Sequence, residues 1–443
     1  MYRPWDDFLK QAAQTCGLPL DQFKYTTALL LGIPLGYFLR YSTKDPWRCS
    51  DAEKASAIST RHMLCAIIGL MEVVYVFGWE TFHSFFSTTV AYILLQVAPR
   101  DKVHLWVTAW AMGYMSCAHI YRMIVDFGGW SIDFTTPQLL VTQKLMNIAF
   151  SLYDGSRDAK KLTEEQSKRK LTACPSVMEM FGYVFCIHTL LAGPATDYND
   201  YLTWIDGSKL AGKKPKPTSA ILLRIVGAIG CAIAFSVVLP YCNIDGHGDG
   251  SYLSTKSFLY VLLWNNFSFC LLRHRYYFAW VLGDAGCNAA GFGYNGEDKN
   301  GKQKWDGVLN VDYFAVEFAP NFRSAMNGEI FSCFRNTATF GMSAVWHGFY
   351  PGYYFTFISC ALFNEVARLL RRHVRPLVIP TKEAEKSLNA TLYHISSSVL
   401  LLTFQKSINY WSYWYFAPHV VALLLYIAVP IVFKQPKDAK KMQ

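Results

Sequence analysis

The sequence lacks the short motifs that mark the best-known metal, redox and nucleotide sites. Its twelve cysteines include no C-x-x-C pair, so the strongest sequence signal for a zinc or redox centre is missing. It also contains no glycine-rich phosphate loop, no dinucleotide-binding fingerprint and no H-E-x-x-H motif. We therefore expect no bound metal and no resident cofactor.

Charge is also scarce, because charged residues make up 17% of the chain and hydrophobic residues 52%. The opening residues, MYRPWDDFLKQAAQ, lack the basic region and short apolar core of a cleaved signal peptide. The apolar run that follows Lys24 is therefore expected to serve as an uncleaved anchor.

What the sequence does contain is a series of long apolar runs. A helix needs roughly 20 apolar residues to cross the hydrocarbon core of a membrane. Runs of about that length lie at 26–39, 63–79, 82–98, 103–125, 219–241, 257–272, 352–367 and 413–434. Shorter runs lie at 137–153, 176–192, 276–290, 336–350 and 392–405, and these are either tilted spans or re-entrant segments shielded by neighbouring protein. The pattern predicts an all-α, polytopic membrane protein with about ten or eleven crossings.

The distribution of Lys and Arg predicts the orientation, because short loops rich in these residues stay in the cytosol. Basic loops lie at 154–170, 207–219, 273–275 (RHR), 297–304 and 368–376, whereas 126–136 and 242–251 contain no Lys or Arg and are expected to face the lumen. We expect one membrane-embedded domain, 1–443, with a cytosolic tail at 435–443. Attraction to anionic membrane lipid explains the basic loops without any nucleic-acid partner.

The stretch SAVWHGFYPGYYFTF, residues 343–357, is almost wholly apolar or aromatic except for His347. Ionisable groups in membrane segments are costly and are usually kept for function or paired inside a bundle. A neutral imidazole is available near pH 7 and is what a general base requires. The alternative interpretation is a core histidine whose ring is hydrogen-bonded to a backbone carbonyl of an adjacent helix.

The residues after His347 favour the functional interpretation. Gly348, Pro351 and Gly352 predict a break in the helix and allow close approach of the backbone. A broken helix at membrane depth is tolerated where it lines a cavity. We expect the aromatic residues Trp346, Tyr350, Tyr353 and Tyr354 to line that cavity and to bind substrate.

This stretch resembles the histidine motif of the membrane-bound O-acyltransferase superfamily, and its GFYPGYY continuation is similar to the lysophospholipid acyltransferase branch. Four further segments follow the order of that family: SLYDGS with LTEEQSKRKL, LLAGPATDYNDY, RHRYYFAWVLGDAGCNAAGFGYNG and WDGVLNVDYFAVEFAPNFRSAMN. With the opening MYRPWDDFL, the likeness covers nearly the whole chain and is nearest to fungal and invertebrate enzymes of broad specificity.

The resemblance implies transfer of a fatty acyl group from acyl-CoA to the free hydroxyl of a lysophospholipid inside an enclosed reaction tunnel. His347 would remove the hydroxyl proton as the oxygen attacks the thioester. Acyl-CoA would be a co-substrate that enters from the cytosol, while the lysophospholipid would come from the membrane lipids. The sequence indicates neither the headgroup and acyl-chain preferences nor the oligomeric state.

One family feature is missing. Members of this family carry an asparagine within a W-N-x-x-T pattern before the histidine helix, but here the chain runs from FAPNFRSAMN directly to GEIFSCFRN, with the expected block absent between Asn327 and Gly328. Asn327 is the candidate for a similar catalytic place, and Asn336 lies nearer to His347. Neither has the flanking Trp and Thr together, and a loop or helix-start role explains either one.

Other segments allow two interpretations. Gly193, Pro194, Asp197 and Tyr198 would shape the cytosolic mouth of an acyl-CoA channel or simply form a Gly-Pro turn at a helix end. The final KKMQ matches a dilysine signal for the endoplasmic reticulum membrane or is an ordinary basic tail. Two other function classes stay open: a catalytically impaired isoform or scaffold that lacks the asparagine block, and a polytopic transporter.

Overall fold

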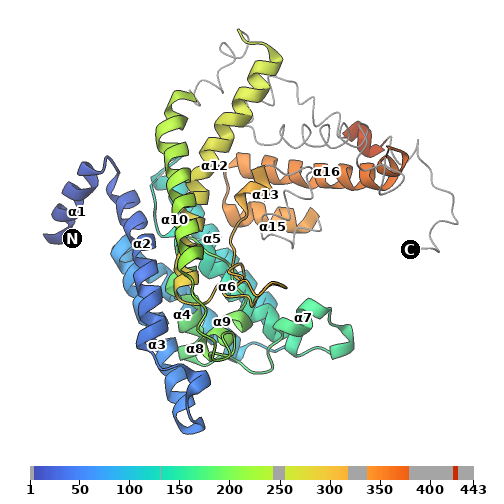
Figure 1. The fold of residues 1–443 in the computed structure, drawn as a ribbon. Coiled ribbons are helices and arrows are strands. Elements are labelled where there is room, and N and C mark those ends of the chain that lie inside the picture. The colour runs from blue at the N-terminus through green and yellow to red at the C-terminus, as the bar shows by residue number, and fades with distance from the viewer. Residues whose placement is uncertain (1–3, 130, 243–254, 318–336, 379–422, 428–443) are drawn as a thin grey trace. The chain divides into compact units, whose positions relative to one another are not determined.

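The computed structural model describes residues 4–129, 131–242, 255–317, 337–378 and 423–427 (Figure 1). The α-helices are α1 (Pro4–Thr15), α2 (Leu20–Ser42), α3 (Asp51–Phe77), α4 (Thr81–Val97), α5 (Val103–Val125), α6 (Thr135–Gly155), α7 (Glu164–Arg169), α8 (Val177–Val184), α9 (Tyr198–Ile205), α10 (Thr218–Ile233), α12 (Phe258–Ala289), α13 (Tyr313–Glu317), α15 (Thr337–His347), α16 (Pro351–His373) and α17 (Arg375–Val378). Short 3-10 turns η1 (Pro46–Arg48), η2 (Gly78–Glu80), η3 (Ala159–Lys161), η4 (Ile187–Thr189) and η6 (Leu239–Cys242) and a π-helical turn, η5 (Ala234–Val238), join some of them. The described residues form no β-strand, so the all-α prediction is confirmed.

Most of the predicted membrane runs are helices. The runs at 26–39, 63–79, 82–98, 103–125, 137–153, 219–241 and 352–367 correspond to α2, α3, α4, α5, α6, α10 with the turns that follow it, and α16. Two stretches, Asp51–Val97 and Thr218–Cys242, are long and apolar enough to cross a membrane by length and composition alone. The run at 392–405, most of 413–434 and the tail at 435–443 lie outside the described residues.

One of the predicted boundaries is wrong. The runs 257–272 and 276–290 are one continuous helix, α12, so RHR lies inside a helix rather than in a loop. Its charge is offset within the protein, because Arg273 forms a two-pronged ion pair with Glu317 of α13. The run 176–192 does not form a tilted span. It is an eight-residue helix, α8, followed by buried irregular chain, which corresponds to the shielded-segment alternative.

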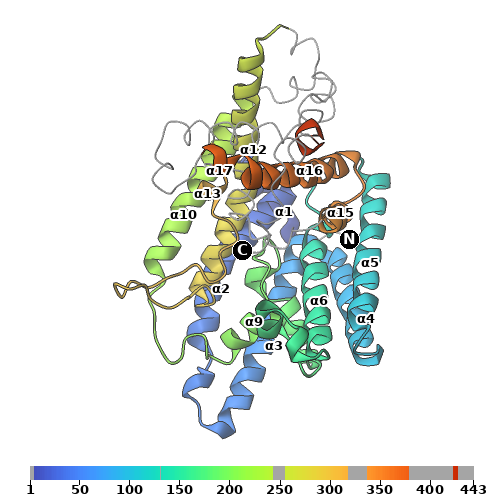
Figure 2. The same ribbon diagram turned by 90° about the vertical axis from the view of Figure 1, so that its right-hand side faces the viewer.

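The chain divides into two compact units, of which the first comprises Met1–Gly230 and Tyr276–Asn310. In this unit α4, α5 and α6 pack against one another, as Figure 2 shows. Apolar side chains recur every three or four residues along α5 and α6, which gives each helix one continuous apolar face. The fully buried positions on these two faces are Val103, Val107, Ala111, Met115, Val141, Leu145, Ile148 and Ala149. The core of the first unit is therefore a helix-to-helix interface, and α3 packs on α8 beside it.

The second unit comprises Cys231–Arg275 and Val311–Gln443. Its described part is dominated by α15 and α16, which pack against each other. Phe363 and Val366 of α16 form a small buried cluster, and Leu425 packs against it. The prediction of a single domain across 1–443 stays a prediction.

Candidate active site

The predicted break after His347 is confirmed. His347 is the last residue of α15, and three residues separate it from Pro351, where α16 begins. Gly348 has φ +122°, a backbone conformation that favours glycine, so the helix ends there. Tyr350 adopts φ −65° and ψ 130°, the extended conformation preferred before proline, and Pro351 takes the first helical position, where it has no hydrogen bond to lose.

Aromatic rings surround the imidazole of His347. The ring of Trp346 lies edge-on, with ring centroids 4.6 Å apart and an interplanar angle of 83°. Tyr353 and Phe357 lie closer to parallel, at 5.6 Å and 31° and at 5.1 Å and 28°. These two residues are four apart on α16, so they share one face of that helix. Because His347 is only half-buried, this set of rings is a partly open aromatic site.

The structure brings together most, but not all, of the predicted substrate-binding residues. Trp346 and Tyr353 contact the imidazole, and Tyr350 contacts Tyr353 at 6.2 Å between ring centroids. In the described part of the chain, no ring contact joins Tyr354 to His347. Asn327 and Asn336 lie outside the described residues. The catalytic and binding roles of all these residues stay predictions.

Phe357 was not predicted as a site residue. Its nearest predicted neighbour, Tyr353, precedes it by one helical turn, so the i, i+4 spacing was the signal that would have found it. The aromatic residues predicted to line the site were Trp346, Tyr350, Tyr353 and Tyr354. The structure extends this lining one turn further into α16.

A second helix break lies in the first unit, between α8 and α9. Here residues 185–197, which we name the buried strap, carry only the short turn η4. Residues 185–194 are all buried, and only Ala195 and Asp197 of the strap are exposed. Irregular backbone inside a membrane protein needs partners for its polar groups, because unsatisfied groups cost several kcal/mol there.

Lys144 of α6 supplies partners at the start of the strap. Its side chain is buried, with 2% of its surface exposed. The Nζ atom donates to the carbonyl oxygens of Tyr183 and Val184 at 3.1 and 3.0 Å, and to Oγ1 of Thr189 at 2.8 Å. Those two carbonyls belong to the last turn of α8, where a helix leaves acceptors without intrahelical donors. Lys144 therefore ends α8 and fixes the first residues of the strap.

Asn147, one turn further along α6, holds the other end of the strap. Its Nδ2 donates to the Asp197 carboxylate, and its Oδ1 accepts from the backbone N–H of Tyr198 at 3.1 Å. Residues 144 and 147 lie on one face of α6 because they are three apart. Asp197 and Tyr198, predicted at a channel mouth or a turn, are thus anchored at the start of α9.

The middle of the strap is held from two further directions. The Tyr25 hydroxyl of α2 donates to the Leu191 carbonyl at 2.9 Å, and Asn310 Nδ2 donates to the Ala192 carbonyl at 2.7 Å. Gly69 of α3 packs so closely that a Cβ there would lie 1.6 Å from the Phe185 carbonyl oxygen. Sequence reasoning did not find these contacts, because their acceptors are backbone groups far along the chain.

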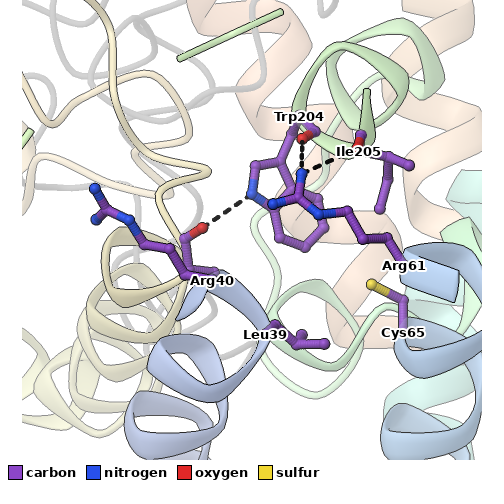
Figure 3. Close-up of a pocket in the computed structure, with 7 residues that line it drawn as sticks. Leu39, Arg40, Arg61, Cys65, Trp204 and Ile205 are labelled. Atoms are coloured by element: carbon purple, nitrogen blue, oxygen red, sulfur yellow. Dashed lines mark hydrogen bonds between the residues drawn. The ribbon is translucent and has the colours of Figure 1, made fainter. Parts of the chain in front are cut away.

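A small cavity in the first unit is lined by residues of α2, α3 and α9 and by Ala290, and Figure 3 shows these residues. Its volume is about 10 Å³, on the order of one water molecule. It is lined by Leu39, Arg40, Arg61, Cys65, Trp204, Ile205 and Ala290. Arg61 extends to the end of α9 and donates to the carbonyls of Trp204 and Ile205 at 3.2 and 3.0 Å. The cavity is too small for a lipid or for CoA, so the reaction tunnel stays a prediction.

The loop after α9 belongs to the basic segment 207–219. Burial lowers the pKa of Lys209, whose Nζ lies 4.8 Å from the centroid of the Phe292 ring. Burial also raises the pKa of Asp200, although the neighbouring Lys209 opposes this shift. Both groups are thus shifted toward their neutral forms.

In the described ranges, no group of three His, Cys, Asp or Glu side chains is placed to hold a metal ion.

Comparisons with known proteins identify the family. The model of the membrane-bound O-acyltransferase family, MBOAT, matches residues 120–327 and 331–395. Lysophospholipid acyltransferase 6 of Drosophila melanogaster is 30% identical over 84% of this chain, which covers 57% of that relative. Membrane-bound glycerophospholipid O-acyltransferase 2 of Mus musculus is 30% identical over 97% of this chain and 89% of its own length. Lysophospholipid acyltransferase of Saccharomyces cerevisiae is 26% identical, with 95% and 76% covered.

The same comparisons agree with the missing block. The family match is interrupted at residues 328–330, directly after Asn327. The alignment with the mouse relative extends over 476 residues, more than the 443 of this chain, so that relative carries residues without a counterpart here. The interruption is local, and the match resumes at 331 and includes His347 with the aromatic residues around it. The chain belongs to the membrane-bound O-acyltransferase family.

Proposed function

We propose that this protein transfers a fatty acyl group from acyl-CoA to the free hydroxyl of a lysophospholipid. The observation that carries the proposal is the imidazole of His347 at a helix break, half-buried among aromatic rings, in a chain similar to lysophospholipid acyltransferases. The environment supplies what the reaction needs: one base, apolar surfaces for a lipid, and partial exclusion of water.

In the proposed chemistry, the lysophospholipid hydroxyl attacks the acyl-CoA thioester directly. The lysophospholipid hydroxyl is a poor nucleophile until its proton is removed, and His347 accepts that proton as the oxygen bonds to the thioester carbonyl carbon. Collapse of the tetrahedral intermediate breaks the C–S bond and releases CoA, whose sulfur takes the proton from the imidazolium, so that His347 returns to its neutral form. The imidazole needs no covalent intermediate for this role, and general-base assistance contributes about 10²- to 10⁴-fold in rate.

Substrates would reach the site from two sides. The basic loops predict that the polyanionic CoA enters from the cytosol, and the lysophospholipid and acyl chain come from the bilayer. The proposal places the protein in the endoplasmic reticulum membrane, in line with the dilysine pattern at Lys440 and Lys441.

The second candidate function is that of an impaired enzyme or scaffold, and the interrupted family match favours it. The developing oxyanion of acyl transfer needs hydrogen-bond donors, and loss of one such donor costs about 10²- to 10³-fold in rate. Asn327, directly before the interruption, is our candidate donor. The family match leaves the transporter alternative without support.

One assay tests the proposal. Microsomes with this chain, or with His347→Ala, receive labelled oleoyl-CoA and a panel of lysophospholipids that differ in headgroup. Labelled phospholipid formed by the parent and at least 100-fold less by His347→Ala supports the enzyme. Absence of product from both, in protein that elutes as a single folded species in detergent, favours the scaffold. Asn327→Ala beside them tests the candidate donor, and an unchanged rate removes it.

A further inference from the structure

The rings around His347 contact different parts of the imidazole. Trp346 meets it edge-on, whereas Phe357 lies within 28° of parallel, with centroids 5.1 Å apart. The two ring nitrogens of an imidazole donate or accept within the plane of the ring. A ring stacked on the face therefore restrains the imidazole without using either nitrogen.

Such a restraint matters because the histidine χ2 torsion has only broad, roughly two-fold preferences of its own. Phe357 is held in a helix whose start is fixed by Tyr350 and Pro351, so its ring position does not depend on α15 alone. A general base must hold its nitrogen within hydrogen-bond reach of the hydroxyl that it deprotonates. Loss of the stacked ring would remove one of the contacts that restrain the plane of the imidazole.

The same ring has a second effect during the reaction. A general base gains a proton, so the neutral imidazole becomes a cation in the transition state. A cation above an aromatic face is stabilised, and the usual strength of this contact corresponds to roughly two- to thirtyfold in rate. Because this contact strengthens only as the charge forms, it raises kcat rather than tightening substrate binding.

We propose that Phe357 is a positioning residue for His347, which fixes the plane of the imidazole and stabilises its protonated form. This inference rests on the proposed acyl transfer, because it assigns His347 the role of the base. It adds to the site a residue that acts through another side chain.

The kinetic test compares Phe357→Leu with a matched control, Phe355→Leu. Phe355 is on the same helix, is 47% exposed and makes no ring contact with His347 in the described structure. Phe357→Leu is expected to lower kcat about two- to thirtyfold, with KM for oleoyl-CoA and for the lysophospholipid unchanged within twofold. Phe357→Tyr, which keeps the aromatic face, and Phe355→Leu are expected to stay within twofold of the parent. An unchanged kcat in Phe357→Leu, or an equal loss in Phe355→Leu, overturns the proposal.

A spectroscopic test does not depend on activity. Protein labelled with ¹³C at the histidine Cε1 position gives a set of NMR signals, and the His347 signal is the one missing from His347→Ala. The ring current of Phe357 acts on this signal, so Phe357→Leu is expected to move it while Phe355→Leu leaves it in place. If the leucine variant does not fold, Phe357→Met replaces it, because methionine has similar bulk and no ring.

The two tests separate the two proposals. A parent protein that forms no phospholipid overturns the proposed function, and the NMR experiment then decides the stacking by itself. A His347 signal that does not move in Phe357→Leu overturns the positioning role, even in an active enzyme.

Discussion

The break after His347 and the break between α8 and α9 are held in different ways. The buried strap, residues 185–197, is fixed by hydrogen bonds from Lys144 and Asn147 of α6, Tyr25 of α2 and Asn310. The break between His347 and Pro351 is instead bordered by aromatic rings that contact the imidazole. Length explains part of the difference, because a long irregular segment leaves many more backbone groups without helical partners than a break of three residues does.

The contrast also separates residues that are expected to stabilise the fold from the residue that is expected to act in the reaction. A strap held by hydrogen bonds from several helices is expected to matter chiefly for stability, since each lost donor leaves a buried acceptor unsatisfied. Ring faces that border a histidine do not themselves engage its in-plane nitrogens, through which a base accepts a proton. We therefore expect mutations at the strap to change stability first and mutations at His347 to change rate first.

The largest effect is expected for Gly69→Ala. The added Cβ would lie 1.6 Å from the Phe185 carbonyl oxygen, so either α3 or the strap must move, and we expect a loss of at least about 3 kcal/mol in stability. Gly113→Ala on α5 is the matched control, because nothing lies within 4 Å of its added Cβ, and helix propensity alone predicts a gain of up to about 1 kcal/mol. Thermal unfolding in detergent measures both. Equal melting temperatures for the two variants would contradict the packing of α3 against the strap.

The second-largest effect is expected on the rate of acyl transfer. His347→Ala is expected to lower kcat about 10²- to 10⁴-fold while the melting temperature stays within a few degrees of the parent. The imidazole is half-buried, so little packing is lost with it. Steady-state kinetics and thermal unfolding on the same preparation give both values. A melting temperature that falls as far as that of Gly69→Ala would show that His347 is a structural residue.

A smaller change is expected for Lys144→Met, which removes the donor to three oxygens of α8 and the strap. We expect a loss of about 2–4 kcal/mol, because the Val184 carbonyl loses its donor and the Tyr183 carbonyl keeps only the N–H of Cys186 at 3.4 Å. Thr142→Val on the same helix is the control, since the Thr142 hydroxyl is buried and has no hydrogen-bond partner to lose. Hydrogen exchange followed by mass spectrometry should become faster at residues 185–197 in Lys144→Met alone. An even rise in hydrogen exchange over the whole chain would contradict a local effect of Lys144 on residues 185–197.

The smallest expected effect is a pH dependence of the stability of the loop 295–305, which lies outside both helix breaks. Backbone N–H groups of Lys302 and Asn300 donate to the Asp298 carboxylate and hold its pKa below the usual value. A carboxyl with a lowered pKa stabilises the folded loop above the unfolded pKa of about 3.9 and loses this contribution as pH falls through the lowered value. Cleavage of the loop 295–305 by an acid-active protease should therefore increase as the pH falls below about 3.9. The increase should be weaker in Asp298→Asn, and identical profiles would contradict the assignment.

Much of the helical fold was predictable because apolar run length alone marks a membrane helix. The run 103–125 coincides with α5, and the Gly and Pro residues after His347 correctly predicted the end of α15. The RHR segment was misplaced because the partner of Arg273 is Glu317, which is 44 residues away and leaves no local pattern.

The candidate site and the strap likewise include residues that the sequence predicted and contacts that it did not. His347 and its neighbours Trp346 and Tyr353 are close in sequence, so composition and spacing pointed to them. Phe357 follows the helical period and was accessible to the same reasoning. The contacts of Lys144 were not, because its acceptors are two backbone carbonyls and a hydroxyl 39 to 45 residues away. No residue type marks a backbone acceptor.

The continuous helix α12 has a geometric consequence for the bilayer. Its 32 residues extend about 48 Å at a rise of 1.5 Å per residue, against a hydrocarbon thickness of about 30 Å. To fit entirely within that layer it would need a tilt of about 50°, beyond the upper end of roughly 40° seen for membrane helices. At least one end of α12 must therefore project into the headgroup region or the water beyond it.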